Sequence, residues 1–257
     1  MKYLKEYNKG TSIGCVIGAA TGLVFSIIVM LIISQGHSIK YPIELWYFAQ
    51  DWLAVVYPLL CSVPFCWETF YQRKSGYLQY VANRKSPPGY LIQRYFFSLG
   101  QVIVLIFVVS FFSAVAALHL ISPAHPSEQS FMQYEAWGEM IINAPIQYVL
   151  LLSAWRVIPS CLIYSLGYVL AVFGKNILIV LTGPFVYSIV ENFAFSAINA
   201  PYLSLITSFF PGRLSADSIT PARMLAGPAT LLVIIAAIFL SEYVRHRKGP
   251  SRCSGIQ

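Results

Sequence analysis

The residue types that carry out most enzyme chemistry are few here and scattered along the chain. No HExxH pair of zinc ligands and no GxSxG nucleophile motif occurs. The tripeptide Gly174-Lys175-Asn176 lacks both the upstream glycine and the following Ser or Thr of a nucleotide-binding P-loop, so the chain does not bind ATP in that way. The four histidines are scattered along the chain: His37, His119, His125 and His246. These observations argue against an enzyme.

Two ionisable residues fall in or beside long apolar runs. Glu191 lies near the outer end of a predicted span, and Arg156 interrupts the run 145–173. An ionisable group in such a position is a functional candidate by default. For Glu191 we favour a simpler interpretation, a helix-end carboxylate that reaches water or pairs with a nearby basic residue. The candidates for that pairing are Arg156, Arg213 and Arg223. We expect the long stem of Arg156 to carry its charge to the outer interface.

The most conspicuous polar stretch is 68–94, which lies between apolar runs and therefore forms a water-facing loop between two membrane crossings. Five of the 17 basic residues fall in it: Arg73, Lys74, Arg84, Lys85 and Arg94. The pattern favours a helix over 69–83, ended by Ser86-Pro87-Pro88-Gly89. Its apolar stripe consists of Tyr77, Leu78, Val81 and Ala82.

A short amphipathic helix held between two long membrane helices could transmit force from a partner docked on it to both of them. The alternative is a solvated basic loop that touches lipid headgroups. The residues alone leave both interpretations open.

The composition indicates what surrounds these residues. The chain of 257 residues is 57% hydrophobic and 11% charged, whereas soluble domains carry roughly 25% charged residues. We therefore predict one membrane domain over 1–257, with no separate soluble domain. The five cysteines show no metal-binding spacing, and those in apolar runs fit small buried hydrophobes. The net charge of +7 is attributed to membrane orientation rather than to nucleic-acid binding.

The apolar runs predict an all-α polytopic fold with six transmembrane helices. Their expected ranges are 15–34, 52–67, 95–121, 158–173, 176–195 and 224–240. We also expect a short interfacial helix at 1–13, a helix on the outer leaflet at 144–156, and a re-entrant outer segment within 196–223. An outer loop at 35–51 would carry Trp46 and Tyr47 as interfacial aromatics. Gly14, Gly18 and Gly22, spaced four residues apart, would allow close helix packing.

The distribution of basic residues orients this topology. All but four of the 17 fall on the side of the two termini. The exceptions are Lys40, Arg156, Arg213 and Arg223. The positive-inside rule then predicts a multi-pass protein of the cell (inner or plasma) membrane, with both termini in the cytoplasm.

The chain resembles the transmembrane subunits of type-2 ABC exporters, permeases made separately from their ATPase. The residues that carry the resemblance are Glu68, Gly76-Tyr77-Leu78, Asn83-Arg84-Lys85-Ser86-Pro87-Pro88, Tyr90-Leu91 and Arg94. The family typically has six spans, an amphipathic N-terminal helix, a re-entrant segment between spans five and six, and small residues at the turn between spans four and five. The double proline at 87–88 departs from its pattern.

The resemblance implies a function in ATP-driven export of a hydrophobic or amphipathic substrate, such as an antibiotic, a peptide or a lipid. Two permease subunits, identical or different, would pair in the lipid bilayer, and a cytoplasmic ABC ATPase would bind the 68–94 loop. ATP and Mg would be bound by that partner, and this chain would carry no cofactor, metal or catalytic residue. Nucleic acid is not an expected partner.

The resemblance also assigns residues. Tyr77, Leu78, Tyr80 and Val81 would fit the ATPase groove, next to the turn at Gly76. Arg73, Lys74, Arg84 and Lys85 would form its charged rim, and Glu68 would brace the loop. The substrate would pass along the dimer seam, lined by the glycine face of span one, span two and span five. The path residues would include Gly18, Gly22, Pro58 and Glu191.

Two other functions stay open from the sequence. The first is a membrane-bound immunity or sensor protein that binds a toxin or peptide without transport, for which the acidic outer loop 122–142 is the only support. The second is an intramembrane enzyme that modifies lipid, which would need polar side chains gathered at one cavity.

Overall fold

The computed structural model describes residues 2–82, 86–128, 130, 132, 137–214 and 219–248. Six of its helices contain segments long and apolar enough to cross a membrane. They are α1 (Lys2–Gly36), α2 (Pro42–Lys74), α4 (Pro87–His119), α6 (Pro145–Phe173), α7 (Ile177–Ala197) and α9 (Pro221–Lys248). The predicted all-α fold with six spans is confirmed, and the chain is a multi-pass membrane protein.

Shorter elements connect the six spans. They are β1 (Ser38–Ile39), α3 (Tyr77–Ala82), β2 (His125–Pro126), α5 (Gly138–Asn143), η2 (Pro201–Leu203), α8 (Leu205–Phe209) and η3 (Pro211–Arg213). The two strands pair in parallel, with Ser38 opposite His125. This pairing joins the connection after α1 to the connection after α4, and it was not predicted.

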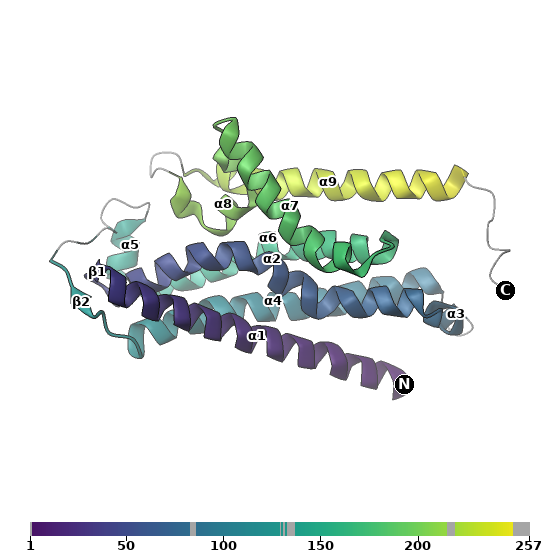
Figure 1. Ribbon diagram of the computed structural model, residues 1–257, viewed down its shortest axis with the longest axis horizontal. Coiled ribbons are helices and arrows are strands. Elements are labelled where there is room, and N and C mark those ends of the chain that lie inside the picture. The colour runs from purple at the N-terminus through teal and green to yellow at the C-terminus, as the bar shows by residue number, and fades with distance from the viewer. Residues whose placement is uncertain are drawn as a thin grey trace.

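The molecule is elongated, with its connections gathered at two ends (Figure 1). The start of α1, the short helix α3 and the C-terminal end of α9 lie at one end, which we call the α3 end. The elements β1, β2, α5 and α8 lie toward the other, which we call the α5 end. Both ends of the described chain therefore lie on the same side of the bundle, as an even number of crossings requires.

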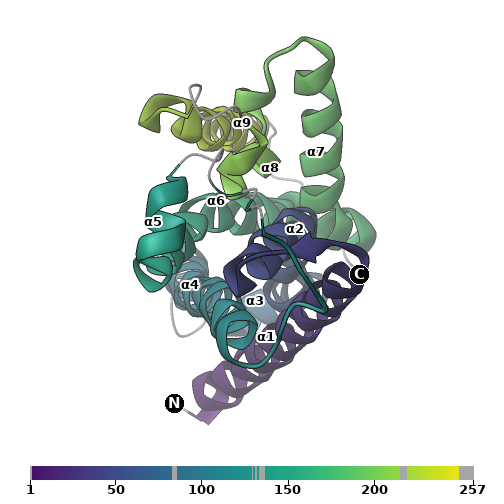
Figure 2. The ribbon, with the colours of Figure 1, turned by 90° about the vertical axis from the view of Figure 1, so that its left-hand side faces the viewer.

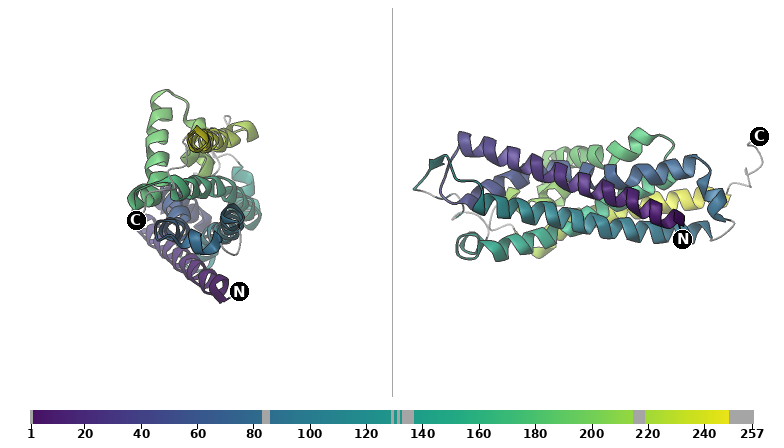
Figure 3. Two further views of the ribbon diagram at one scale, coloured as in Figure 1. Left: turned by 90° about the vertical axis from the view of Figure 1, so that its right-hand side faces the viewer. Right: turned by 90° about the horizontal axis from the view of Figure 1, so that it is seen from below.

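Helix α2 is the centre of the packing, since it contacts α1, α4, α6 and α7. Viewed from the α5 end, α9 lies to one side of the other spans, where it contacts α6 and α8 (Figure 2), and α1 runs along the outside of the bundle (Figure 3). The glycines of α1 allow this helix to approach closely. A Cβ atom on Gly18 would come within 2.9 Å of Leu105, and one on Gly22 within 3.0 Å of Val109. The expected packing role of these glycines is confirmed.

Two predictions near the N-terminus need correction. Residues 2–13 are helical, but they are the first turns of α1 and not a separate interfacial helix. The stretch 42–51 belongs to α2 and not to an outer loop. Trp46 and Tyr47 are buried in the bundle and are not interfacial. Trp46 lies inside because its indole N–H donates to the Ser110 carbonyl (3.0 Å) and to the Ser113 hydroxyl (3.1 Å).

The predicted helix break near Arg156 is also wrong. α6 continues through Pro159 as one helix of 29 residues. At about 1.5 Å per residue this is roughly 44 Å, enough to cross a tilted path through a ~30 Å hydrocarbon core. Next to the proline, the Ser160 hydroxyl donates to the Arg156 carbonyl one turn earlier (2.7 Å), so this side chain finds its hydrogen-bond acceptor within the helix.

The segment between α7 and α9 forms the short elements η2, α8 and η3. All five residues of α8 are buried, and this helix contacts α6, α7 and α9. Five residues rise only about 8 Å, so α8 enters the bundle without crossing it. This arrangement agrees with the expected re-entrant segment.

Candidate functional site

The described residues of the 68–94 stretch form the end of α2, the short helix α3 and the start of α4, all at the α3 end. α2 continues to Lys74, the chain turns at Ser75 and Gly76, and α3 follows at Tyr77. Gly76 has a φ of +72°, a backbone conformation that costs a residue with a side chain roughly 1 kcal/mol or more. Gly76 therefore allows α3 to begin directly after α2.

Four side chains join α2 to α4 beside this turn, and we call them the clamp: Glu68, Gln72, Tyr90 and Arg94. Arg94 lies 3.6 Å from the Glu68 carboxylate, and only 2% of its side chain is exposed. The Gln72 side-chain oxygen accepts hydrogen bonds from the Tyr90 hydroxyl (3.0 Å) and from the Arg94 guanidinium. The Gln72 amide donates in turn to Glu68 (3.4 Å). The clamp fixes the two helices to each other where α3 leaves them.

Arg73 connects the same region to the α6–α7 turn. Its guanidinium donates to the carbonyl oxygens of Val172 (2.5 Å) and Gly174. These carbonyls lie at the C-terminal end of α6, where backbone acceptors lack partners within the helix and attract positive charge. We expected Arg73 at the charged rim of a docking helix. Its side chain is half-buried, and its guanidinium instead binds the end of α6, because this helix end offers two acceptors.

The remaining residues assigned to ATPase coupling are described in part. The rings of Tyr77 and Tyr90 are 6.4 Å apart, so Tyr77 packs toward α4. Leu78 and Val81 are partly exposed, and Lys74 is exposed. Arg84 and Lys85 lie outside the described residues, and for Tyr80 only the backbone is described.

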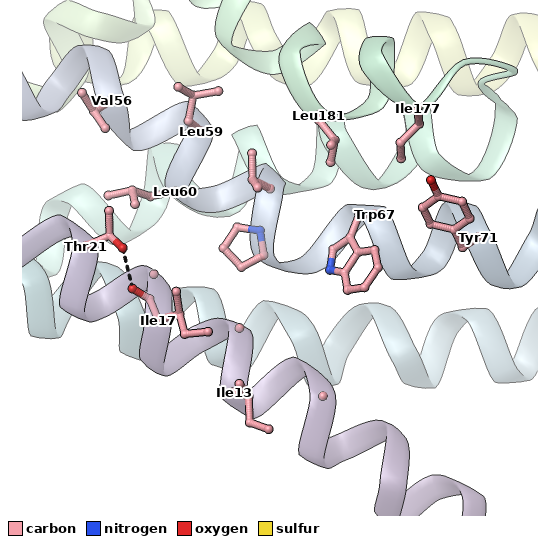
Figure 4. A pocket seen from close by; sticks show the side chains of 15 residues that line it. Ile13, Ile17, Thr21, Val56, Leu59, Leu60, Trp67, Tyr71, Ile177 and Leu181 are labelled. Atoms are coloured by element: carbon pink, nitrogen blue, oxygen red, sulfur yellow. Dashed lines mark hydrogen bonds between the residues drawn. The ribbon is translucent and has the colours of Figure 1, made fainter.

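A cavity of about 910 Å³ lies beside the clamp, between α1, α2 and α7, and we call it the groove (Figure 4). α1 contributes residues from Gly10 to Thr21, α2 contributes residues from Val56 to Tyr71, and α7 contributes Ile177 and Leu181. These are the three helices expected to line the substrate path.

The path residues named from the sequence occupy different places. Gly18 lines the groove. Gly22 packs against Val109 and Leu60, and Pro58 is buried in α2. Glu191 contacts α8 and is not among the residues that line the groove. The structure therefore brings only Gly18 of the four to this cavity.

Arg156 is fully buried and does not reach an interface. Its guanidinium donates to the Phe209 carbonyl (3.1 Å) and to the Ser110 hydroxyl (2.8 Å), and lies 5.0 Å from the Trp46 ring. No carboxylate in the described part of the chain forms an ion pair with it. The expectation of a charge reaching water was wrong because α8 supplies a backbone acceptor inside the bundle.

Glu191 was expected to reach water or to pair with a basic residue; it is buried, and no basic residue in the described ranges forms an ion pair with it. It is 6% exposed, and its carboxylate accepts a hydrogen bond from the Leu205 backbone N–H at the start of α8. The neighbouring Asn192 accepts from the Ser204 hydroxyl (3.0 Å). Arg213 pairs instead with Asp51 at 2.6 Å. Glu191 thus holds the re-entrant segment to α7.

Gln72 and Tyr90 were missed as functional candidates. A signal was present, since Glu68 and Gln72 are spaced four residues apart, as are Tyr90 and Arg94, and such pairs share a helix face. Two facing polar pairs at the ends of neighbouring helices favour a contact between them.

Comparison of this chain with protein families, curated proteins and solved structures found no match. Within the described residues, no three His, Cys, Asp or Glu side chains gather as they would around a metal ion. Any function must therefore be inferred from the geometry of the clamp, α3 and the groove.

Proposed function

We propose that this chain is the transmembrane subunit of an ATP-driven exporter of the ABC type, which moves a hydrophobic or amphipathic substrate. A separate cytoplasmic ATPase would bind ATP and Mg and dock on α3, and a second permease subunit would complete the transporter. In this proposal the α3 end faces the cytoplasm. The observation that supports this proposal most strongly is the position of α3, which lies between two long helices that the clamp joins to each other.

The dimensions of α2 and α4 support this role. Each has 33 residues, or about 50 Å at 1.5 Å per residue, whereas the hydrocarbon core is about 30 Å thick. Both helices can therefore reach beyond the bilayer while crossing it. A push on α3 would act on two rigid elements at once, because Glu68 and Arg94 prevent them from separating at that end.

A movement of α3 would also be transmitted to the helices that line the groove. Arg73 links α2 to the α6–α7 turn, and α7 begins three residues after Gly174. α2 and α7 both line the groove. Motion of a partner docked on α3 would therefore change the spacing of two groove walls, as an ATP-driven pathway requires.

The decisive experiment is co-purification of the tagged chain with an ATPase encoded beside it, followed by measurement of ATP turnover. Replacing both Leu78 and Val81 by Asp should lower recovery of the ATPase at least tenfold, because a charge would replace each apolar contact. Gln79→Asp is the matched control, since Gln79 is exposed on the same helix. It should leave the complex intact.

Two results would contradict the proposal. One is full recovery of the ATPase with the double Asp variant, provided the variant unfolds at the same temperature as the parent chain. The other is labelling of a cysteine placed at Gln79 by a membrane-impermeant reagent added to intact cells, which would put α3 outside.

A further inference from the structure

The lining of the groove restricts what it could hold. None of the 15 lining residues is Asp, Glu, Lys, Arg or His. The Thr21 hydroxyl is already bonded to the Ile17 carbonyl (2.8 Å). The remaining polar groups are the Trp67 indole and the Tyr71 phenol. Burying a charge or an unpaired polar group against such walls is costly, so the part of a ligand that enters must be apolar.

The groove also matches one leaflet of a bilayer in length. Along α1 it extends from Gly10 to Thr21, about 17 Å at 1.5 Å per residue. Half of a ~30 Å hydrocarbon core is about 15 Å. Two of its α1 residues, Ile13 and Ile17, remain 52% and 61% exposed. The groove is thus open toward the bilayer, and a chain can enter it sideways.

The end of the groove nearest α3 is different in character. Trp67 and Tyr71 lie there on α2 (Figure 4), each 48% exposed, and such amphipathic rings favour the level of the lipid headgroups. Lys74 follows Tyr71 by three residues on the same helix. Lys175 precedes the groove residue Ile177 by two, and both lysines are exposed. Two exposed lysines therefore lie next to one end of the otherwise apolar groove.

We propose that the groove binds one acyl chain of an anionic phospholipid-like amphiphile from the leaflet at the α3 end. The chain lies against the glycine face of α1, and the phosphate lies near Lys74 and Lys175. This deepens the proposed function, on which the role of the groove as the substrate entrance rests. The binding itself requires no ATPase.

The test uses the full chain in lipid nanodiscs containing a phosphatidylglycerol analogue with a diazirine on its acyl chain. After illumination, labelled peptides are identified by mass spectrometry. Label should concentrate in 10–21 and 56–71. Val63→Trp, which fills the groove from α2, should reduce label in these peptides at least fivefold. Val16→Trp is the matched control, because Val16 is 68% exposed on α1 but does not line the groove, and label should be unchanged.

Ile17→Trp fills the groove from the opposite wall and should give the same loss, so the result does not depend on one variant folding well. Lys74→Gln with Lys175→Gln should lower labelling by the anionic probe. A basic residue near an anionic surface contributes about fivefold to binding. Labelling by a phosphatidylcholine probe should change less.

Label spread evenly over the exposed faces of α7 and α9, or unchanged by both Trp variants, would overturn the proposal and indicate ordinary boundary lipid. Equal losses for the two headgroups in the lysine variant would overturn the assignment of the phosphate. Because these measurements use the chain alone, their failure is separate from a failure of ATPase docking on α3.

Discussion

At the α3 end the buried Arg94 pairs with a carboxylate, whereas Arg156 and Glu191, deeper in the fold, form no ion pair with any residue that the structure describes. Glu68, the partner of Arg94, keeps 23% of its side chain exposed. Arg156 and Glu191 instead bind backbone groups of the re-entrant segment, the Phe209 carbonyl and the Leu205 N–H. Both regions bury charged side chains, but Arg94 is balanced by an opposite charge, whereas Arg156 and Glu191 are held by hydrogen bonds to backbone groups.

This difference suggests that the clamp can rearrange more easily than the re-entrant segment that contains α8. The clamp pair opens more easily than a fully buried contact, because water can reach the partly exposed Glu68 carboxylate and Arg94 keeps its bond to Gln72. A buried guanidinium that leaves its carbonyl and hydroxyl acceptors has no water to replace them. We therefore expect the contacts of Glu68 to rearrange more readily than those that hold α8 between α6 and α7. Meanwhile α2 and α4 stay joined by Arg94, Gln72 and Tyr90. Substitutions at three positions, taken from the largest expected effect to the smallest and with control substitutions for two of them, would test this contrast.

Arg156→Met should give the largest loss of stability. It removes two hydrogen bonds from a charged donor and the contact with the Trp46 ring, and it leaves the Phe209 carbonyl unpaired. Hydrogen bonds of charged groups contribute about 1.5–3 kcal/mol each, and less inside membrane bundles. We expect a loss of about 3 kcal/mol in the free energy of unfolding, measured by thermal unfolding in detergent.

Arg213→Met is the matched control for that measurement. It removes an arginine that pairs with Asp51, but 30% of the Arg213 side chain is exposed. Exposed ion pairs contribute about 0–1 kcal/mol, so its loss should be much smaller. Equal losses of unfolding free energy from the two changes would show that the buried contacts of Arg156 contribute no more than an exposed ion pair. The contrast between buried and partly exposed charges would then fail.

Glu191→Ala should cost about 1–2 kcal/mol, because it leaves the first N–H of α8 without its acceptor. Glu191→Gln retains an oxygen at that position and should cost much less. Thermal unfolding of both variants measures the difference. If Gln proves as harmful as Ala, the negative charge itself matters, and Glu191 would be more than a support for the re-entrant segment.

The outline of this fold could be predicted because six apolar runs of sufficient length leave few alternatives in a bilayer. The burial of Trp46 and Arg156 could not be predicted in this way. Each depends on an acceptor from a distant segment, Ser110 for one and Phe209 for the other, and neither spacing nor composition places those segments. The same reason explains the wrong helix break at Arg156, since the expected cost of the charge is removed by α8.

The candidate site could be predicted only in part from the sequence. The resemblance singled out Glu68, and the structure gives it Arg94 as a partner. The glycines of α1 predicted close packing, but their positions did not show which ones face a cavity and which face a neighbouring helix. Gly18 does both, since Leu105 lies close to it while it lines the groove. That distinction depends on how α1 is rotated about its own axis.

Glu68→Gln should have the smallest effect on stability, about 0.5 kcal/mol, because Glu68 is partly exposed and Arg94 keeps its bond to Gln72. The effect should shrink in part in 1 M NaCl, because ions reach the partly exposed Glu68, although a pair with a buried partner is screened less than two exposed charges. Unfolding midpoints at low and high salt measure this, with Glu191→Ala as the comparison. The cost of Glu191→Ala should stay constant with salt, since the lost contact is buried and has no charged partner. A salt-independent cost at Glu68 would mean that its carboxylate is as fixed as that of Glu191, and the contrast between the clamp and α8 would fail.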